Sequence, residues 1–179
     1  IRSEILANSR SQLKTSRNLY KLPLNQEYID KNAHMGQVFG WERPLYFNKI
    51  KEPNLTFGKP DWFNNVGEEV LFAHKAAAVF DMSCFGKIDI IGPDAEHFLL
   101  QTCAGYMQRP PGSVIYSAVL NERGTYESDI TAQRITRDHY RLFVGTNTIK
   151  RDHSWFNAMT NGFNVKIEDT TANYGVLSL

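Results

Sequence analysis

The 179-residue sequence lacks the features that mark several large classes of protein. It has two cysteines, no apolar run near the roughly 20 residues that cross a bilayer, and 20 Lys and Arg against 19 Asp and Glu. A balanced charge without a basic cluster argues against binding to nucleic-acid phosphates and against a polybasic membrane anchor. We therefore expect neither a nucleic acid nor a membrane among the partners.

Glycine spacing excludes one kind of cofactor site. Twelve glycines are present, but no two are separated by a single residue, so a Gly-x-Gly-x-x-Gly fingerprint for FAD or NAD does not occur. Gly86 and Lys87 lack the earlier glycine and the following Ser or Thr of a phosphate-binding loop. This stretch of chain is not expected to hold a dinucleotide in that way.

Cysteines and histidines give no metal pattern. Cys84 and Cys103 match neither a zinc knuckle nor a redox Cys-x-x-Cys, and none of the five histidines stands four residues from another histidine or from a cysteine. We expect two buried thiols in a reducing compartment and no metal site. The compartment is then the cytoplasm, or the mitochondrial matrix in a eukaryote.

The residues that are present predict a packed α+β domain. Hydrophobic residues make up 42% of the chain and include 11 Phe, 8 Tyr and 3 Trp, enough for a core. Periodicity predicts helices over residues 26–34, 67–80, 93–105 and 147–159, and strands over residues 85–91, 114–120, 126–135, 140–144, 163–167 and from 174 onward. The short links after residues 120 and 135 imply antiparallel hairpins, so an antiparallel-rich sheet is expected.

Three details of this prediction bear on the fold. Alternation in the strand over residues 85–91 predicts a half-exposed strand, with Lys87 and Asp89 on its outer face. Residues 1–43 are typical of a connecting segment, and the aromatic, proline-punctuated residues 41–63 of an extended packed loop. The chain begins without Met and stops inside a strand pattern, so we expect a fragment of a longer chain, although a terminal strand can also close a sheet.

Asp129 is the most suggestive single residue. In the strand that follows the turn at residues 121–124, Glu127, Asp129 and Thr131 share one face by alternation. A carboxylate in mid-strand is costly to bury without donors. It therefore either faces solvent or points at a ligand that supplies N–H groups, such as a pterin.

Several motifs in order along the chain resemble the folate-binding fold of the glycine cleavage T-protein (aminomethyltransferase) family. They are VFDMSCFGKI at residues 79–88, GPDA at residues 92–95, and YSAVLNERG at residues 116–124 leading to Asp129. FGWERP at residues 39–44 and FGKPDWF at residues 57–63 resemble the version fused behind a flavin domain in sarcosine and dimethylglycine dehydrogenases. The resemblance implies that residues 1–40 connect to an upstream flavin domain and that residues 41–179 form the N-terminal part of the folate domain.

The resemblance also implies a function and a site. In that family an FAD domain oxidises an N-methyl amine, and tetrahydrofolate captures the one-carbon unit in the folate domain; the FAD domain would lie outside this chain. The family's key acid matches Asp129, as a general base. Tyr116 matches a position that lines the folate site, Thr131 is a further candidate on the face of Asp129, and Phe85 could pack on the pterin face.

The match departs from the family pattern in the turn, where Thr125 stands in place of a second glycine. Two other functions share this architecture. One is a non-catalytic regulatory protein of the pyruvate dehydrogenase phosphatase type, against which the retention of Asp129 leans. The other is a free-standing aminomethyltransferase, against which the long segment before Trp41 argues.

Overall fold

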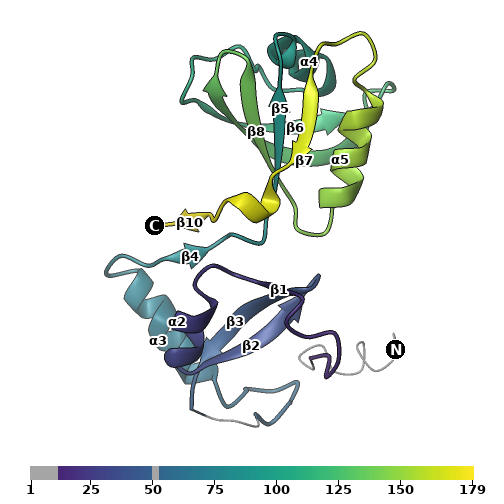
Figure 1. Ribbon diagram of the computed structural model, residues 1–179. Coiled ribbons are helices and arrows are strands. Elements are labelled where there is room, and N and C mark those ends of the chain that lie inside the picture. The colour runs from purple at the N-terminus through teal and green to yellow at the C-terminus, as the bar shows by residue number, and fades with distance from the viewer. Residues whose placement is uncertain (1–11, 50–52) are drawn as a thin grey trace. The chain divides into compact units, whose positions relative to one another are not determined.

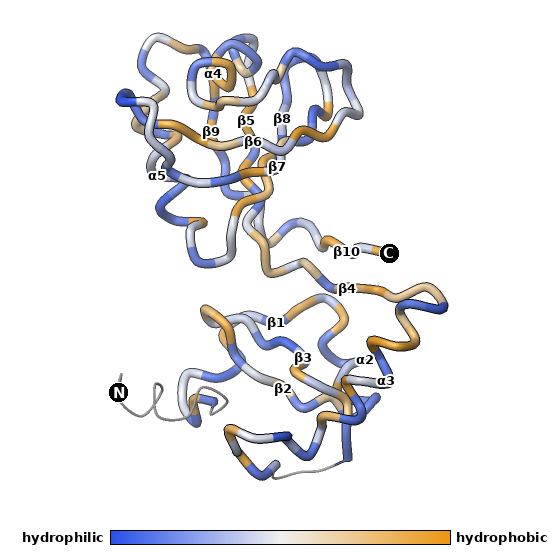
Figure 2. The backbone as a smooth tube through the Cα atoms, turned by 180° about the vertical axis from the view of Figure 1, so that it is seen from behind, coloured by the Kyte–Doolittle hydropathy of each residue, from blue (hydrophilic) through white to orange (hydrophobic). Residues whose placement is uncertain are grey.

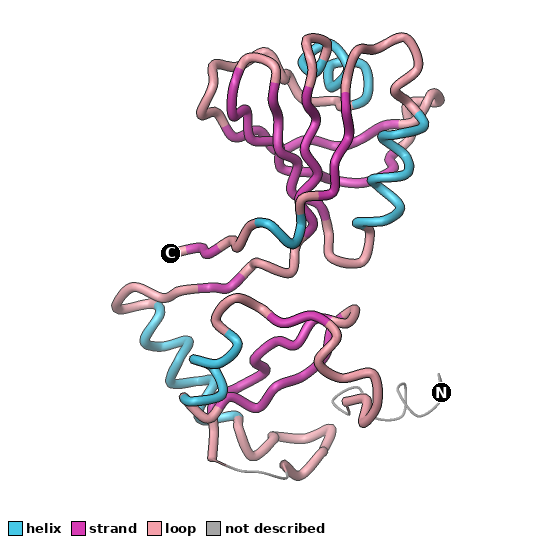
Figure 3. The backbone as a smooth tube through the Cα atoms, viewed as in Figure 1, coloured by secondary structure: helices cyan, strands magenta, loops and turns pink. Residues whose placement is uncertain are grey.

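The computed structural model describes residues 12–49 and 53–179, and it divides into two compact units (Figure 1). The first unit comprises Ile1–Met82 and Leu177–Leu179, and the second comprises Ser83–Val176. Both units combine helices with mostly antiparallel strands (Figure 3). The predicted α+β class with an antiparallel-rich sheet is therefore confirmed. The predicted domain boundary at residue 40 stays a prediction.

The first unit contains two small sheets and two helices. Its elements are β1 (Tyr20–Lys21), α2 (Asn25–Asp30), β2 (Ala33–Val38), β3 (Trp41–Phe47), α3 (Phe63–Ala73), β4 (Phe80–Asp81) and β10 (Leu177–Ser178). The strand order is β1-β3-β2, with β1 parallel and β2 antiparallel to β3, while β4 pairs antiparallel with β10. The segment predicted as a connection thus carries regular structure from Tyr20 onward.

A two-residue turn joins β2 to β3. Val38 pairs with Trp41, and the residues between them, Phe39 and Gly40, both have positive φ, of 50° and 87°. Two left-handed residues match the right-handed twist of the flanking strands, and glycine takes this conformation at no steric cost. The turn sets the register that brings Glu42 into the interior of the unit.

Glu42 forms the main buried ion pair of the first unit. Its side chain is only 3% exposed, and its two carboxylate oxygens accept from Arg17 Nε at 2.8 Å and Arg17 Nη2 at 2.6 Å. The Asn18 backbone N–H also donates to Oε1 at 2.8 Å. These hydrogen bonds from Arg17 hold the pKa of Glu42 below its ordinary value.

The α3 helix differs from its prediction. It begins at Phe63 and ends at Ala73, whereas the pattern predicted residues 67–80, and Phe80 belongs to β4. None of its residues is buried within the described parts of the chain, and Val70, Leu71 and Phe72 are each more than half exposed. Figure 2 shows this hydrophobic character along α3 and the segment before β4.

The second unit is a five-stranded antiparallel sheet covered by two helices. Its elements are β5 (Gly86–Ile91), α4 (Ala95–Thr102), β6 (Val114–Leu120), β7 (Tyr126–Thr136), β8 (His139–Val144), α5 (Ile149–Ala158), β9 (Lys166–Asp169) and the 3-10 helix η1 (Thr171–Asn173). The strand order is β6-β7-β8-β5-β9. One apolar cluster contains side chains of α4, α5 and four of these strands, so both helices pack on the same face.

The opposite face of this sheet carries the polar residues singled out in the sequence. Cross-strand pairing aligns Tyr116, Thr131, Phe143 and Lys87 in one row across β6, β7, β8 and β5. In an antiparallel ladder directly opposed residues project to the same side. Asp129 is two residues from Thr131 along β7 and therefore lies on this face as well.

The prediction of a half-exposed strand at residues 85–91 is wrong. Lys87 has no exposed surface and Asp89 is 3% exposed, because β8 and β9 pair with both edges of β5 and the residues after β9 fold back on it. The Thr170 backbone N–H donates to the Lys87 carbonyl at 2.8 Å, and the Thr171 hydroxyl accepts from the Lys87 N–H at 3.0 Å. Contacts with segments that are distant in the sequence therefore bury the side chains of Lys87 and Asp89.

The other predicted elements of the second unit are close to those observed. β6 has the predicted bounds, and β7 and β8 differ from theirs by one residue. Thr148, not Asn147, is the residue before α5, and α4 begins at Ala95, two residues after Pro93. The strand predicted over residues 163–167 lies at Lys166–Asp169.

Both cysteines are buried and free, and burial raises the pKa of Cys103 to about 12.

Candidate functional site

Asp129 lies on the sheet face opposite the helices, where its side chain is exposed. Each of its carboxylate oxygens accepts a hydrogen bond from a tyrosine. Tyr116 Oη donates to Oδ2 at 3.2 Å, and Tyr126 Oη donates to Oδ1 at 3.0 Å. Both tyrosines are largely exposed, at 72% and 61%. The result is an accessible carboxylate held between two phenols.

A β-bulge brings Tyr126 to this site. Val119 pairs with Ser128, but the next residue, Leu120, pairs with Tyr126, so β7 carries one extra residue here. Strict alternation would place Tyr126 on the opposite face from Asp129, because the two residues are three positions apart. An inserted residue resets the alternation and re-aims the side chains on one side of it. The strand pattern alone therefore missed Tyr126.

Asp129 helps to raise the pKa of both tyrosine hydroxyls. The hydrogen bond to Asp129 is the largest cause that raises the pKa of Tyr116. Desolvation is the largest cause for Tyr126, followed by its hydrogen bond to Asp129, and the pKa of Tyr126 is also raised. A phenol that donates to a carboxylate loses its proton less readily. Both tyrosines therefore remain neutral donors at physiological pH.

Asn121 organises the turn that precedes the site. Its Oδ1 accepts from the backbone N–H groups of Arg123 at 3.0 Å and Thr125 at 3.1 Å. Its Nδ2 donates to Thr125 Oγ1 at 2.6 Å and to Glu127 Oε1 at 2.8 Å. Asparagine favours such turns because its short side chain bonds to nearby backbone groups. Thr125, the departure from the family pattern, supplies one of these hydrogen-bond acceptors.

The predicted site residues lie on two parts of the sheet. Tyr116 and Thr131 are directly opposed on β6 and β7, and Asp129 is next to them, so these three lie together. Phe85 precedes β5 and lies toward the same end of the sheet as Asp129, but β8 separates β5 from β7. Two strand spacings amount to roughly 10 Å. Phe85 is thus beside the carboxylate site and not part of it.

A second carboxylate, Asp89, lies on the same face near β9. Arg141 donates to it from Nε at 2.7 Å and from Nη2 at 2.8 Å, and His139 Nε2 lies 3.0 Å from Oδ2. The Thr170 hydroxyl donates to Oδ1 at 3.2 Å. Burial alone would raise the pKa of Asp89, but the hydrogen bonds and charges of Arg141 and His139 outweigh it and lower the pKa.

The described parts of the chain contain neither a metal-binding cluster nor a membrane-spanning helix. Across residues 12–49 and 53–179, no three His, Cys, Asp or Glu side chains are grouped so that they could hold a metal ion. Within these same residues, no helix is both long and apolar enough to cross a membrane.

Comparison with known protein families shows to which family this chain belongs. The model of the GCVT N-terminal domain matches residues 24–179, which include the whole second unit, most of the first and all of the Asp129 site. The chain belongs to this family. The predicted resemblance to the aminomethyltransferase family is thereby confirmed.

Relatives of this GCVT-type chain include proteins of different activity. It is 32% identical to the mouse mitochondrial pyruvate dehydrogenase phosphatase regulatory subunit over 95% of this chain and 20% of that protein. It is 29% identical to the Staphylococcus epidermidis aminomethyltransferase over 90% of this chain and 40% of that protein. Mouse mitochondrial sarcosine dehydrogenase is 28% identical over 91% of this chain and 22% of that protein.

A solved structure supports the same fold. The glycine cleavage system aminomethyltransferase T from Bartonella henselae matches with a TM-score of 0.68 and 24% identity, over 86% of this chain and 39% of that one. The GCVT-type chain thus spans between about a fifth and two fifths of the length of these relatives. It is an aminomethyltransferase-like domain related to sarcosine dehydrogenases.

Proposed function

We propose that this domain binds tetrahydrofolate and that Asp129 acts as the general base for one-carbon capture. The observation that carries the proposal is an exposed carboxylate in mid-strand, with one phenol on each oxygen, inside the segment that matches the family. A pterin presents several N–H donors, from which a carboxylate readily accepts hydrogen bonds. The open sheet face around Asp129 is chemically suited to such a ligand.

The residues of this chain have separate tasks in the proposed reaction. When bound, tetrahydrofolate supplies the nitrogen that accepts the one-carbon unit. Asp129 orients that amine and takes up its proton as the nitrogen bonds to carbon, which contributes on the order of 10² to 10⁴ in rate. Tyr116 and Tyr126 are positioning residues that hold the two carboxylate oxygens in place. Thr131 lines the same face, and Phe85 would meet only a ligand that extends across β8.

The wider assignment follows the sarcosine dehydrogenase relatives. We infer that the domain serves an FAD-dependent N-methyl amine dehydrogenase whose flavin is bound outside these residues, because this chain carries no dinucleotide fingerprint. Its partners are then a folate, an N-methyl amine and the remainder of the same polypeptide. The expected compartment is the cytoplasm, or the mitochondrial matrix in a eukaryote.

The test is a titration of tetrahydrofolate into the full-length protein and its Asp129→Asn variant. We expect the variant to bind more weakly and to lose on the order of 10² to 10⁴ in methylene-tetrahydrofolate formation. Asp138→Asn makes the same chemical change on an exposed carboxylate in the β7–β8 turn and should leave both unchanged. Equal binding and equal product yield in the Asp129→Asn protein would refute the role of Asp129.

A regulatory, non-catalytic role is the second candidate. It is favoured by the 32% identity to the mouse phosphatase regulatory subunit over 95% of this chain. The two functions differ in product, since a regulatory protein could bind folate without forming methylene-tetrahydrofolate from an N-methyl amine. Folate binding without any turnover in the full-length protein would favour the regulatory role.

A further inference from the structure

Two buried side-chain atoms have no hydrogen-bond partner among the described residues, Tyr46 Oη and Asp152 Oδ2. The void beside Asp152 has a volume of about 10 Å³, room for no more than a single water. The pocket lined by Tyr46 has a volume of about 260 Å³. Only the second is large enough for an organic ligand.

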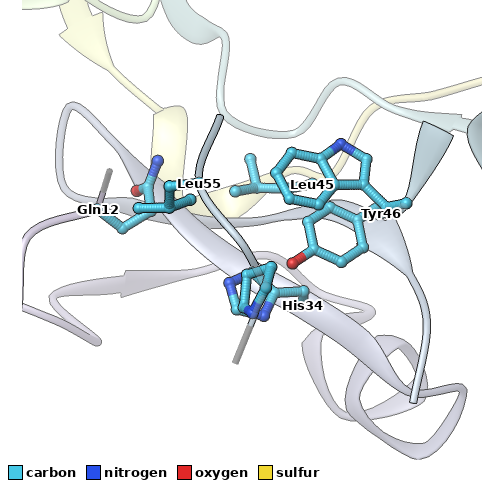
Figure 4. A pocket seen from close by; sticks show the side chains of 7 residues that line it. Gln12, His34, Leu45, Tyr46 and Leu55 are labelled. Atoms are coloured by element: carbon cyan, nitrogen blue, oxygen red, sulfur yellow. The ribbon is translucent and has the colours of Figure 1, made fainter. Parts of the chain in front are cut away.

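The Tyr46 pocket lies wholly within the first unit. Its walls are a mixture of aromatic, aliphatic and amide side chains: Gln12, His34, Leu45, Tyr46, Pro53, Leu55 and Trp62. Figure 4 shows Gln12 and Leu55 on one side of the pocket and Tyr46 on the other, with the Tyr46 hydroxyl directed toward the space between them. Tyr46 itself is only 3% exposed.

Parallel aromatic rings form one side of this pocket. The His34 and Tyr46 rings stack with centroids 4.9 Å apart and planes 4° apart. Tyr46 and Trp62 stack with centroids 4.4 Å apart and planes 2° apart. Because rings on both faces fix the Tyr46 ring, its hydroxyl cannot turn away to reach solvent. This buried hydroxyl has no partner among the described residues, and a buried hydroxyl left unpaired is costly.

The lining groups select the chemistry of that partner. Gln12 Oε1 already accepts from the Gln37 backbone N–H at 2.8 Å, so the Gln12 amide can offer its NH₂ group. Desolvation, followed by the charge of Arg17, lowers the pKa of His34, so its imidazole is neutral at physiological pH. Among the described residues, none of the seven that line the pocket carries a formal charge in this state. A ligand with hydrogen-bond acceptors and no net charge fits these donors.

We propose that this pocket binds a small, uncharged, planar molecule with a carbonyl acceptor, such as a heteroaromatic carboxamide or lactam. The carbonyl accepts from the Tyr46 hydroxyl, and the ring lies against the aromatic side of the pocket. The volume lies just below the range of about 300 to 1,000 Å³ of ordinary ligand sites, which limits the ligand to about one ring and its substituent. The site shares no residue with the Asp129 site.

The test uses nicotinamide as the probe and the whole chain as the protein. Binding is followed by ligand-observed NMR and by tryptophan fluorescence, to which Trp62 contributes together with Trp41 and Trp155. Benzoate has a similar shape with a charge, and cyclohexanecarboxamide has the carboxamide without the flat ring. We expect nicotinamide to bind in about the millimolar range and both of the other compounds to bind at least fivefold more weakly.

Tyr46→Phe removes the hydroxyl and keeps the ring, so the aromatic stack remains. We expect this variant to bind nicotinamide at least fivefold more weakly, while Tyr106→Phe, the same change at an exposed tyrosine, binds as the parent does. Two-dimensional NMR of the variant verifies that the first unit stays folded. Absence of nicotinamide binding, equal binding of benzoate, or equal binding by Tyr46→Phe would each overturn the proposal.

Discussion

Two carboxylates on the same sheet face of the second unit have opposite surroundings. Asp89 is buried, and a guanidinium, an imidazole and a hydroxyl hold its oxygens. Asp129 is exposed, and only two neutral phenols hold its oxygens. A buried ion pair is fully occupied by its permanent partners, whereas an exposed carboxylate with one neutral donor on each oxygen keeps lone pairs that can accept from a ligand as well. Asp89 therefore has a structural role, whereas the carboxylate of Asp129 is accessible to a ligand.

The largest expected effect on stability comes from Asp89→Asn. The substitution leaves the buried Arg141 guanidinium without its counter-charge, which costs about 3 to 5 kcal/mol. Chemical denaturation measures this loss. Asp138→Asn is the matched control, because Asp138 is 55% exposed and its contact with Arg137 is 3.8 Å long; we expect a change of no more than about 0.5 kcal/mol. Equal stability of the two variants would contradict a structural role for Asp89.

Acid should remove the Asp89 contribution in a defined pH range. The folded-state pKa of Asp89 lies below its ordinary value, so the unfolded chain takes up the proton first as the pH falls. The stabilisation is complete above about pH 4 and is lost as the pH falls through the lower folded-state value. We expect the difference in unfolding free energy between the parent and Asp89→Asn to shrink below about pH 4. A constant difference down to pH 2 would be inconsistent with this ionisation.

Tyr46 provides a third case, a buried polar group without any partner among the described residues. Tyr46→Phe removes the orphaned hydroxyl and should raise the free energy of unfolding of the ligand-free chain by about 1 to 2 kcal/mol. Thermal or denaturant unfolding measures the gain, with Tyr106→Phe as the exposed control. A loss of stability in Tyr46→Phe would indicate that the hydroxyl has a bound partner in the free protein.

The smallest effect is expected at Tyr126. Tyr126→Phe removes one of two donors to Asp129 and leaves Tyr116 in place, so the proposed one-carbon capture should fall severalfold while stability stays unchanged. Combining it with Tyr116→Phe should lower the rate further, because both carboxylate oxygens are then unsupported. The specific readout is the rate of methylene-tetrahydrofolate formation compared with the affinity for tetrahydrofolate, since a positioning role lowers the rate more than the binding. An unaltered rate in the double variant would exclude the positioning role.

The local pattern of the second unit predicted much of its fold. β6, β7 and β8 have bounds within one residue of those predicted, since alternation and the short turns between them are local signals. The same alternation placed Asp129 and Thr131 on one face, which the register with β6 confirms. The strands β2 and β3 of the first unit were not predicted, because scattered apolar residues and Pro44 obscure their alternation.

By itself, the sequence determined the α+β class, the family, and the strand that carries Asp129. Only the tertiary structure decided which neighbours complete each site. An extra residue in β7 turned Tyr126 toward Asp129, the segment after β9 buried Asp89, and stacking with His34 and Trp62 fixed the Tyr46 hydroxyl. These outcomes depend on register and on long-range packing, which a local pattern does not encode because it reports only the period of its own strand.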